Sequence, residues 1–167
     1  MVYTAQSLMQ EGIPFRMKEQ PKNIYQSPIA MDLTAYLRYA LYEDNVSDFF
    51  RIMNRPVRYI RRSNVPLKPF SMQELMHACS NEDYVVPNII QMYDDFHFIK
   101  GLNPYSAVNF IRKGVGYDAY IKKQCLERSV DSAPKIEELD ELQQLAKDFD
   151  TIEEWLTHIA CYDAVMQ

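Results

Sequence analysis

The sequence predicts an all-α fold of about eight helices, with one short strand near the N-terminus. Glycine is scarce, with 4 residues among 167, and this composition favours helices over tight β-turns. Apolar residues recur at spacings of three and four along several segments, as they do on the buried face of a helix. Helix start and stop signals separate these segments. The length suits one domain with its own hydrophobic core.

The chain is expected to begin with a short α/β edge. Residues 4–11 have the pattern of a helix, and Gly12 is placed as its C-terminal stop. Residues 13–17 are predicted as a strand, followed by a loop with two prolines at residues 21–28. A small segment of mixed structure is therefore expected before the helical region.

Two helices and an arginine-rich loop are predicted next. The apolar stripe of the first helix is formed by Ile29, Leu33, Tyr36, Leu37, Ala40 and Leu41. Asp44 or Asn45 is expected to cap the second helix. That helix should end before Pro56, because the residue preceding a proline disfavours the helical region. Residues 55–69 are predicted as a loop rich in arginine and proline.

Capping boxes, glycines and prolines delimit the remaining helices. Ser71 with Glu74, and Thr151 with Glu154, have the capping-box spacing, in which each side chain bonds a free backbone amide of the other residue. The other boundary residues are Gly101, Asn103, Pro104, Gly114, Gly116 and Pro134, and the glycines are interpreted as helix stops or caps. Helices are predicted at residues 71–79, 84–100, 103–113 and 117–126, from residue 134 and from residue 151.

No membrane-spanning or secretory segment is expected. The longest apolar runs are far short of the roughly 20 residues that cross a bilayer. Residues 1–11 lack the charged and apolar regions of a signal peptide. The odd number of cysteines, Cys79, Cys125 and Cys161, predicts free thiols in a reducing compartment, and their apolar neighbours favour the core. A cytoplasmic location without a membrane partner is therefore predicted.

No pattern of catalytic or metal-binding residues stands out. The histidines have no metal-ligand spacing to one another or to cysteine. Gly114 and Gly116 are too close together for a phosphate-binding loop, and no Lys-Ser or Lys-Thr pair follows them. Adjacent acids such as Asp94 and Asp95 point to different faces of a helix. We therefore expect no catalytic residue, metal site or cofactor in this chain.

Charge is distributed unevenly along the sequence. The net charge of −5 does not suggest a nucleic-acid partner. Residues 51–68, however, include six basic residues and no acidic one: Arg51, Arg55, Arg58, Arg61, Arg62 and Lys68. Residues 131–163 hold ten acidic residues against two lysines. This asymmetry is compatible with local binding of a polyanion by a protein that is acidic overall.

Residues 54–63 form the strongest candidate site. Arginines in a loop between two helices suit contacts with a DNA backbone, and a tyrosine among them suits packing on a sugar or base. The predicted DNA-binding residues are Arg55, Arg58, Tyr59, Arg61 and Arg62. The alternative is a solvated basic loop, or arginines that pair with the acidic helices of residues 131–163.

An ordered set of motifs runs through the first part of the chain. The set comprises Gly12-Ile-Pro-Phe-Arg16, Asp32-Leu-Thr-Ala-Tyr-Leu-Arg38, Asp44-Asn-Val-Ser-Asp-Phe-Phe-Arg51 and Arg51-Ile-Met-Asn-Arg-Pro-Val-Arg58. The first motif resembles the strand that precedes a large insertion in the second RecA-like motor domain of superfamily 1 DNA helicases of the UvrD/Rep/PcrA type. The others resemble that family's D-x-x-x-Y-L-R-L, its N-D-D and its F-x-R-I-x-N-x-P-x-R.

Motifs in the second part follow the same family order. Residues 116–120 resemble the family's G-Y-x-x-Y, residues 137–149 its N-L-x-E-L-x-x-x-A-x-x-F, and residues 151–160 its L-x-x-F-L-x-H-I-A. Residues 67–113 match only in their helical pattern. The resemblance implies that residues 1–20 are a remnant edge of the second motor domain. Residues 21–167 would then be a helical accessory domain of the 2B type, ending about where the motor domain resumes.

The chain departs from the family pattern at the candidate site. Many members have a Gly-Ile-Gly turn after the P-x-R, and this turn meets the DNA duplex through backbone amides. Tyr59, Ile60 and Arg61 occupy those places here. Backbone approach by glycine is therefore expected to be lost, and side-chain contact with added arginine charge would replace it.

For the parent protein, the resemblance implies an ATP-dependent 3′-to-5′ DNA helicase that acts in unwinding, repair or replication. ATP and magnesium are expected only in that parent, because its ATP-binding loop and acidic magnesium-binding pair lie outside this chain. The chain alone is expected to bind duplex DNA weakly and to pack on the motor domains.

Two other hypotheses are a free-standing helical protein-interaction module and a helix-turn-helix DNA regulator. The recognition helix of the regulator would begin at Ser71 with Glu74, which suits phosphate approach poorly. The genomic reading frame discriminates between the helicase domain and the free-standing interaction module. A frame that continues into motor motifs supports the helicase, whereas a stop codon after Gln167 supports the interaction module.

Overall fold

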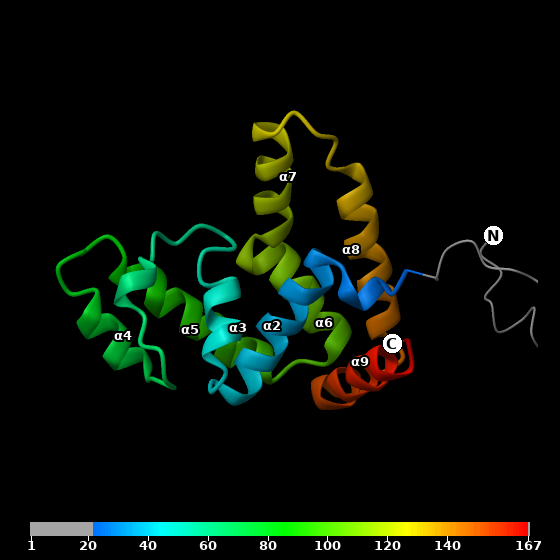
Figure 1. Cartoon of the computed structure of the whole chain (residues 1–167), viewed down its shortest axis with the longest axis horizontal. Coiled ribbons are helices and arrows are strands. Elements are labelled where there is room, and N and C mark those ends of the chain that lie inside the picture. The colour runs from blue at the N-terminus through cyan, green and yellow to red at the C-terminus, as the bar shows by residue number, and fades with distance from the viewer. Residues whose placement is uncertain (1–21, 167) are drawn as a thin grey trace, which may run out of the picture.

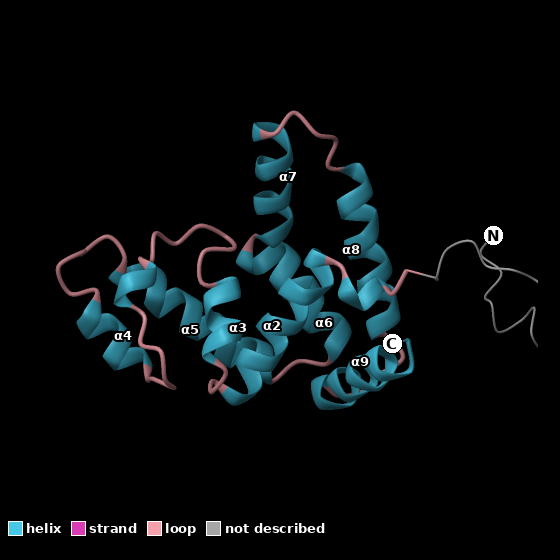
Figure 2. Cartoon of the chain, viewed as in Figure 1, coloured by secondary structure: helices cyan, strands magenta, loops and turns pink. Residues whose placement is uncertain are grey.

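The computed structural model describes residues 22–166, and this part of the chain consists of helices and loops without a strand (Figures 1 and 2). The all-α prediction is therefore confirmed for the described part. The predicted helix at residues 4–11, the predicted strand at residues 13–17 and the motor-domain edge expected at residues 1–20 lie outside it. None of the described helices is long and apolar enough to span a membrane.

Eight α-helices make up most of residues 22–166. They are α2 (Pro28–Tyr42), α3 (Val46–Ile52), α4 (Met72–Ala78), α5 (Val86–Lys100), α6 (Pro104–Asn109), α7 (Tyr117–Glu127), α8 (Ala133–Ala146) and α9 (Ile152–Met166). Three short turns accompany them: the 3₁₀ turn η1 (Ile24–Gln26) before α2, the 3₁₀ turn η2 (Arg62–Asn64) between α3 and α4, and the π-helical turn η3 (Phe110–Val115) between α6 and α7. Most of the predicted helix ends lie within about two residues of the observed ones.

Helix α2 occupies the centre of the fold and packs against α3, α5, α8 and α9 (Figure 1). Ser27 begins it by accepting a hydrogen bond from the backbone amide of Ala30 at 3.1 Å, and Pro28 follows in the first turn. The predicted apolar stripe is confirmed, since all six of its residues are buried. The same helix also buries Asp32, which becomes important below.

Helix α3 is capped by Asn45 rather than by Asp44. The side chain of Asn45 accepts a hydrogen bond from the backbone amide of Asp48 at 3.2 Å. Arg38 of α2 donates two hydrogen bonds to the carboxylate of Asp48, at 2.6 and 2.7 Å, and so holds the two helices together. The helix ends before Pro56, as predicted, and leads into the arginine-rich loop.

The two predicted capping boxes have different outcomes. Ser71 and Glu74 form a complete box: the Ser71 hydroxyl accepts from the Glu74 amide at 3.2 Å, and the Glu74 carboxylate accepts from the Ser71 amide at 2.6 Å. At α9, Thr151 accepts from the amide of Glu154, but the Glu154 carboxylate accepts from the amide of Asp150 instead of Thr151. The second box is therefore only half formed.

The two glycines before α7 also differ in role. Gly116 has φ 97°, in the left-handed region, and separates η3 from α7, as expected of a helix cap. Gly114 lies inside the π-helical turn. A Cβ atom at Gly114 would approach the Phe110 ring to 2.4 Å, so this glycine is needed for packing and the prediction that it is a cap was wrong.

Helices α7 and α8 form an antiparallel pair that projects from the top of the body in this view, whereas α4 lies at the left end (Figure 1). Helix α9 packs on the segment before α2. The Tyr25 ring meets the Trp155 ring edge to face at 6.4 Å, and Asn23 donates to the carboxylate of Asp163 at 2.6 Å. The last helix is therefore anchored by an aromatic cluster and one polar contact.

Candidate nucleic-acid interface

The arginine-rich segment after α3 forms a turn at residues 58–60 whose backbone is held by side-chain hydrogen bonds. The Oδ1 atom of Asn54 accepts hydrogen bonds from the backbone amides of Arg58 and Ile60, at 3.3 and 3.1 Å. Its Nδ2 atom donates to the carbonyl of Ile60 at 2.9 Å. Asn88 of α5 donates to the carbonyl of Arg58 at 3.2 Å, and the Ile60 side chain is buried. Two asparagine side chains therefore fix the backbone of residues 58–60.

Tyr59 lies at the apex of this turn with a left-handed backbone. Its φ is 60°, a conformation that is rare for bulky residues and costs an L-residue roughly 1–2 kcal/mol. The side chain is 65% exposed, and its ring meets the ring of Tyr84 edge to face with centroids 6.4 Å apart. The backbone conformation that favours glycine is thus present at a tyrosine.

Arg58 is buried and has a structural role. It is 7% exposed, and its Nη1 atom donates to the carbonyls of Ile52 and Met53 at 2.9 and 3.2 Å. Its Nη2 atom donates to the hydroxyl of Tyr36 at 2.7 Å. Carbonyls in the last turn of a helix have no partner within the helix, so Arg58 caps α3. This placement does not support the predicted contact of Arg58 with DNA.

Replacement of Arg58 by alanine is expected to lower the free energy of unfolding by about 2 kcal/mol, because two carbonyls and a buried hydroxyl lose a charged donor. Chemical denaturation followed by circular dichroism measures the change. Lys68→Ala is the matched control in the same loop, and its effect should stay below about 0.5 kcal/mol since Lys68 is exposed. Equal losses in the two variants would contradict the capping role.

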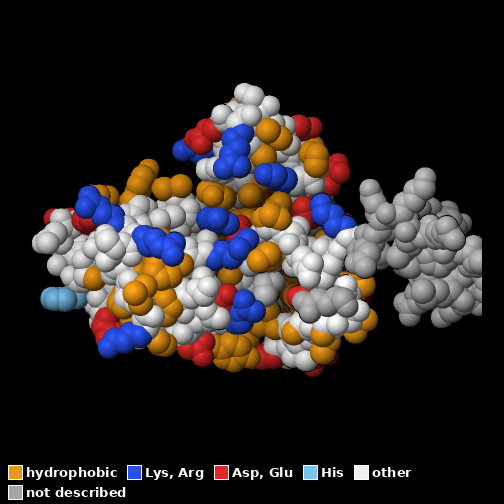
Figure 3. Space-filling view, in the orientation of Figure 1, with side chains coloured by type: hydrophobic (Ala, Val, Ile, Leu, Met, Phe, Trp, Pro, Cys, Tyr) orange, Lys and Arg blue, Asp and Glu red, His pale blue; other side chains and the backbone are white. Residues whose placement is uncertain are grey.

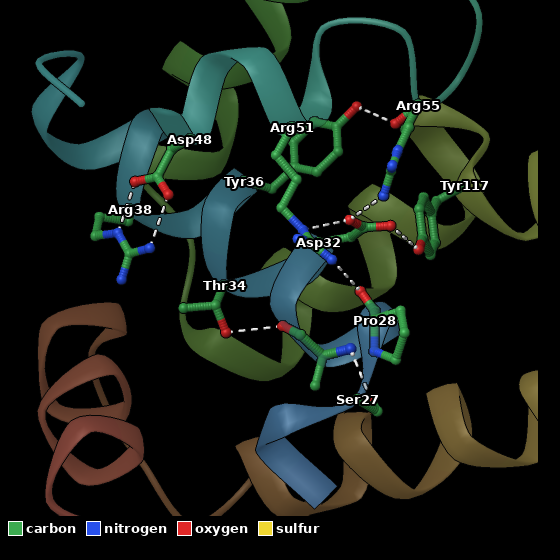
Figure 4. Close-up of polar contacts among 11 residues, drawn as sticks. Ser27, Pro28, Asp32, Thr34, Tyr36, Arg38, Asp48, Arg51, Arg55 and Tyr117 are labelled. Carbon is green, nitrogen blue, oxygen red and sulfur yellow. Dashed lines mark hydrogen bonds and ion pairs between the residues drawn. The ribbon is translucent and has the colours of Figure 1, made fainter. Parts of the chain in front are cut away.

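Arg51 and Arg55 converge on the buried carboxylate of Asp32 (Figure 4). Arg51 Nε and Arg55 Nη1 donate to its Oδ1 atom, at 2.7 and 2.8 Å, and the hydroxyl of Tyr117 donates to Oδ2 at 2.6 Å. Burial and the neighbouring carboxylate raise the pKa of Tyr117, so the phenol stays protonated and acts as a donor. One carboxylate therefore joins α2, α3, the arginine-rich loop and α7.

Arg61 and Arg62 carry their charges at the surface. Arg61 has a side chain that is 67% exposed, with Nε 2.9 Å from a carboxylate oxygen of Glu82. Arg62 lies over the ring of Phe50, with 4.4 Å between its guanidinium carbon and the ring centroid. Lysine and arginine side chains gather across the middle of the visible face (Figure 3). Both arginines are therefore accessible to solvent in the folded loop.

The acidic partners of the segment come from α2 and from the loop before α5. Arg51 and Arg55 pair with Asp32, and Arg61 pairs with Glu82. The sequence also allows the alternative that the arginines pair with the acidic helices of residues 131–163, but the ion pairs of Arg51, Arg55 and Arg61 are made with other residues. Within residues 22–166, an ion pair with those helices is made by Arg112, which contacts Asp140 of α8.

Arg112 is the centre of a second buried cluster. Its guanidinium donates to both carboxylate oxygens of Asp118, at 2.9 and 3.1 Å, and to Gln143 Oε1 at 2.7 Å. Burial alone would raise the pKa of Asp118, but hydrogen bonds and charges from Arg112 and Lys113 outweigh it and lower that pKa. The cluster ties η3 to α7 and α8 and serves the fold.

The cysteines agree with the sequence prediction in part. Cys79 and Cys125 are buried, as expected of core residues, whereas Cys161 is exposed on α9. All three thiols are free. Within residues 22–166, no group of three histidine, cysteine or acidic side chains comes together in a way that could hold a metal ion.

The candidate DNA-contacting surface combines four of the five residues predicted to bind DNA with one residue that the sequence did not indicate. Arg55, Tyr59, Arg61 and Arg62 are at least partly exposed, and Tyr84 joins them from another segment. Nothing in the local pattern singled out Tyr84, because its pairing depends on a contact between distant segments. No protein-family model, curated protein or solved structure matches this chain.

Proposed function

We propose that this chain is an accessory, DNA-contacting domain of a UvrD-like, ATP-dependent 3′-to-5′ DNA helicase. The observation that carries the proposal is the backbone of Tyr59. The ordered motifs place the first glycine of the family's DNA-contacting turn at this position, and Tyr59 has the φ of 60° that glycine favours. A positive φ at a position where the resemblance expects glycine supports the proposal.

The charge at this turn also supports contact with DNA. Arg61, Arg62 and Lys68 are exposed, and Arg55 keeps 41% of its side chain exposed while it pairs with Asp32. Cations of this kind bind phosphates by displacing condensed counterions, which requires no base contact. Three or four phosphates can therefore be neutralised on a molecule whose net charge is −5.

In the parent protein, this domain would pack against the motor domains and control how duplex DNA approaches them. ATP and magnesium would be bound by those motor domains, and unwinding would be an activity of the whole protein. The present chain would contribute a rigid DNA-contacting turn, fixed by Asn54 and Asn88. Through the parent, it would take part in DNA unwinding, repair or replication.

Duplex DNA is expected to bind the chain with a dissociation constant no tighter than about 10⁻⁶ M and a log–log salt slope of roughly −3 to −4. Fluorescence anisotropy with a labelled blunt duplex at several salt concentrations measures both. Removing two cations in Arg61→Ala/Arg62→Ala should weaken binding and reduce the magnitude of the slope by about 2.

The matched control is Lys122→Ala/Lys123→Ala, which removes two exposed cations from α7. Its affinity for the duplex should stay close to that of the unchanged chain. Equal losses in both double variants would mean that binding is diffuse and that the turn is not the site. Absence of duplex binding by the unchanged chain would favour a protein-interaction module.

A further inference from the structure

Two exposed tyrosines from distant segments meet beside the arginines. Tyr59 is 65% exposed and Tyr84 is 60% exposed. Their rings meet edge to face, with 6.4 Å between centroids and 69° between ring planes. By contrast, the side chains of Tyr36, Tyr39 and Tyr117 are fully enclosed in the core. The Tyr59–Tyr84 pair therefore contributes little apolar burial to the fold.

The relative position of the two tyrosines is fixed by their backbones. Asn88 Nδ2 lies 3.2 Å from the carbonyl oxygen of Arg58 and 3.4 Å from that of Tyr84, so one amide group bridges the residue before Tyr59 and Tyr84 itself. Asn54 holds the other side of the turn at Ile60. The rings are thus presented by a preorganised backbone, which lowers the entropy lost on binding a ligand.

The fold itself gives no reason for an aromatic residue at position 59. A left-handed φ of 60° is more favourable for glycine than for tyrosine, and the tyrosine side chain lies mostly in solvent. Strained backbone positions cluster at ligand-contacting sites, and Tyr59 differs from Glu43 and Ser129, which have a similar φ just after the helices α2 and α7. The ring is therefore the part of Tyr59 that needs a functional explanation.

The neighbouring charges indicate which ligand suits the pair. Arg61 and Arg62 follow Tyr59 at the surface, and Glu82, two residues before Tyr84, is paired with Arg61. Asp83 is exposed beside Tyr84 and opposes tight binding of a polyanion. Exposed aromatic faces next to guanidinium groups suit nucleobases joined to phosphates, because every base has a face that stacks on an aromatic ring.

We propose that Tyr59 and Tyr84 form a stacking platform for unpaired nucleobases, adjacent to the arginines that hold the duplex backbone. This inference rests on the proposed function and adds a ligand class to it. The preferred ligand is a duplex with a single-stranded tail, in which unpaired bases are available at the end of the duplex. Inside a blunt duplex each paired base keeps both faces stacked on its neighbours, and only the two terminal pairs expose one face, so a blunt duplex offers the platform far fewer base faces than a single-stranded tail does.

The test compares three labelled DNAs: a blunt duplex, the same duplex with a short base-containing 3′ tail, and the duplex with an abasic tail of equal length. The two tails carry the same phosphates and differ only in their bases. We expect the unchanged chain to bind the base-containing tail about fivefold or more tightly than the abasic one. Tyr59→Gly and Tyr84→Ala should each reduce the ratio of the two affinities, base-containing tail over abasic tail, toward one.

Tyr59→Phe keeps the ring and should keep the ratio, while Tyr42→Ala removes an exposed tyrosine from the end of α2 and should leave it unchanged. Tyr59→Gly should melt within a few degrees of the unchanged chain, since glycine suits the backbone at this position. Equal affinity for both tails, or a full ratio in Tyr59→Gly, would overturn the stacking platform alone. Failure to bind even the blunt duplex would overturn the proposed function as well.

Discussion

Replacement of Arg112 by alanine is expected to destabilise the domain by about 3–5 kcal/mol, the range for breaking a buried ion pair. The side chains of Arg112 and Asp118 are 5% and 6% exposed. Removing the guanidinium leaves the Asp118 carboxylate with Lys113 as its remaining ion-pair partner and removes the donor to Gln143. Since native domains are stable by only about 5–15 kcal/mol, much of the fold's stability would be lost. Chemical denaturation measures the loss.

The pH dependence of this loss follows from the lowered pKa of Asp118. A carboxyl group whose pKa is lower in the folded state stabilises the fold above its usual value of 3.8, and that contribution disappears as the pH falls through the folded-state value. Without Arg112, the pKa of Asp118 should rise. The difference in the free energy of unfolding between the unchanged chain and Arg112→Ala should therefore be largest near neutral pH and should narrow below pH 4.

Two variants serve as controls for the Arg112 cluster. Asp140→Asn removes an ion-pair partner whose side chain is 61% exposed, so it should change stability by at most about 1 kcal/mol. Arg112→Met/Asp118→Leu replaces both buried charges by apolar groups and should recover much of the loss of the single variant. A double variant no more stable than Arg112→Ala would show that the loss has a different cause, such as a cavity.

Replacement of Asp32 by alanine is expected to cost about 3 kcal/mol of stability. Three donors lose their acceptor at once, and a hydrogen bond to a charged group is worth about 1.5–3 kcal/mol. The total loss is smaller than the sum of three such hydrogen-bond energies, because Arg51 and Arg55 are partly exposed and water can solvate them. Thermal and chemical denaturation of Asp32→Ala both measure the effect.

The Asp32 variant also separates stability from DNA binding. Its folded form frees Arg51 and Arg55 from their carboxylate, so affinity for a blunt duplex should stay the same or increase even though the fold is weakened. Asp44→Asn is the matched control, because it removes an exposed acidic charge from the loop between α2 and α3 and should alter stability by less than about 0.5 kcal/mol. A loss of duplex binding by folded Asp32→Ala would mean that Asp32 orients the arginines for contact.

The sequence determined the helical fold of the described part because its signals are local. The stripe on α2, the Asn45 cap, the Ser71–Glu74 box and the stop at Gly116 each depend on residues a few positions apart. Spacing along the chain is therefore enough to predict them. The same reasoning identified Tyr59 and the exposed arginines as members of a charged loop.

Only the tertiary structure decided which arginines are free to bind a ligand. In sequence, Arg58 and Arg62 are equivalent cations of one loop, yet Arg58 is enclosed against the end of α3 and Arg62 lies at the surface. The partners that distinguish them are a helix end and the side chains of Tyr36 and Phe50. A buried charge requires compensating donors or acceptors in three dimensions, and the pairing of Asp32 with Tyr117, 85 residues away, depends on helix packing that local spacing does not encode.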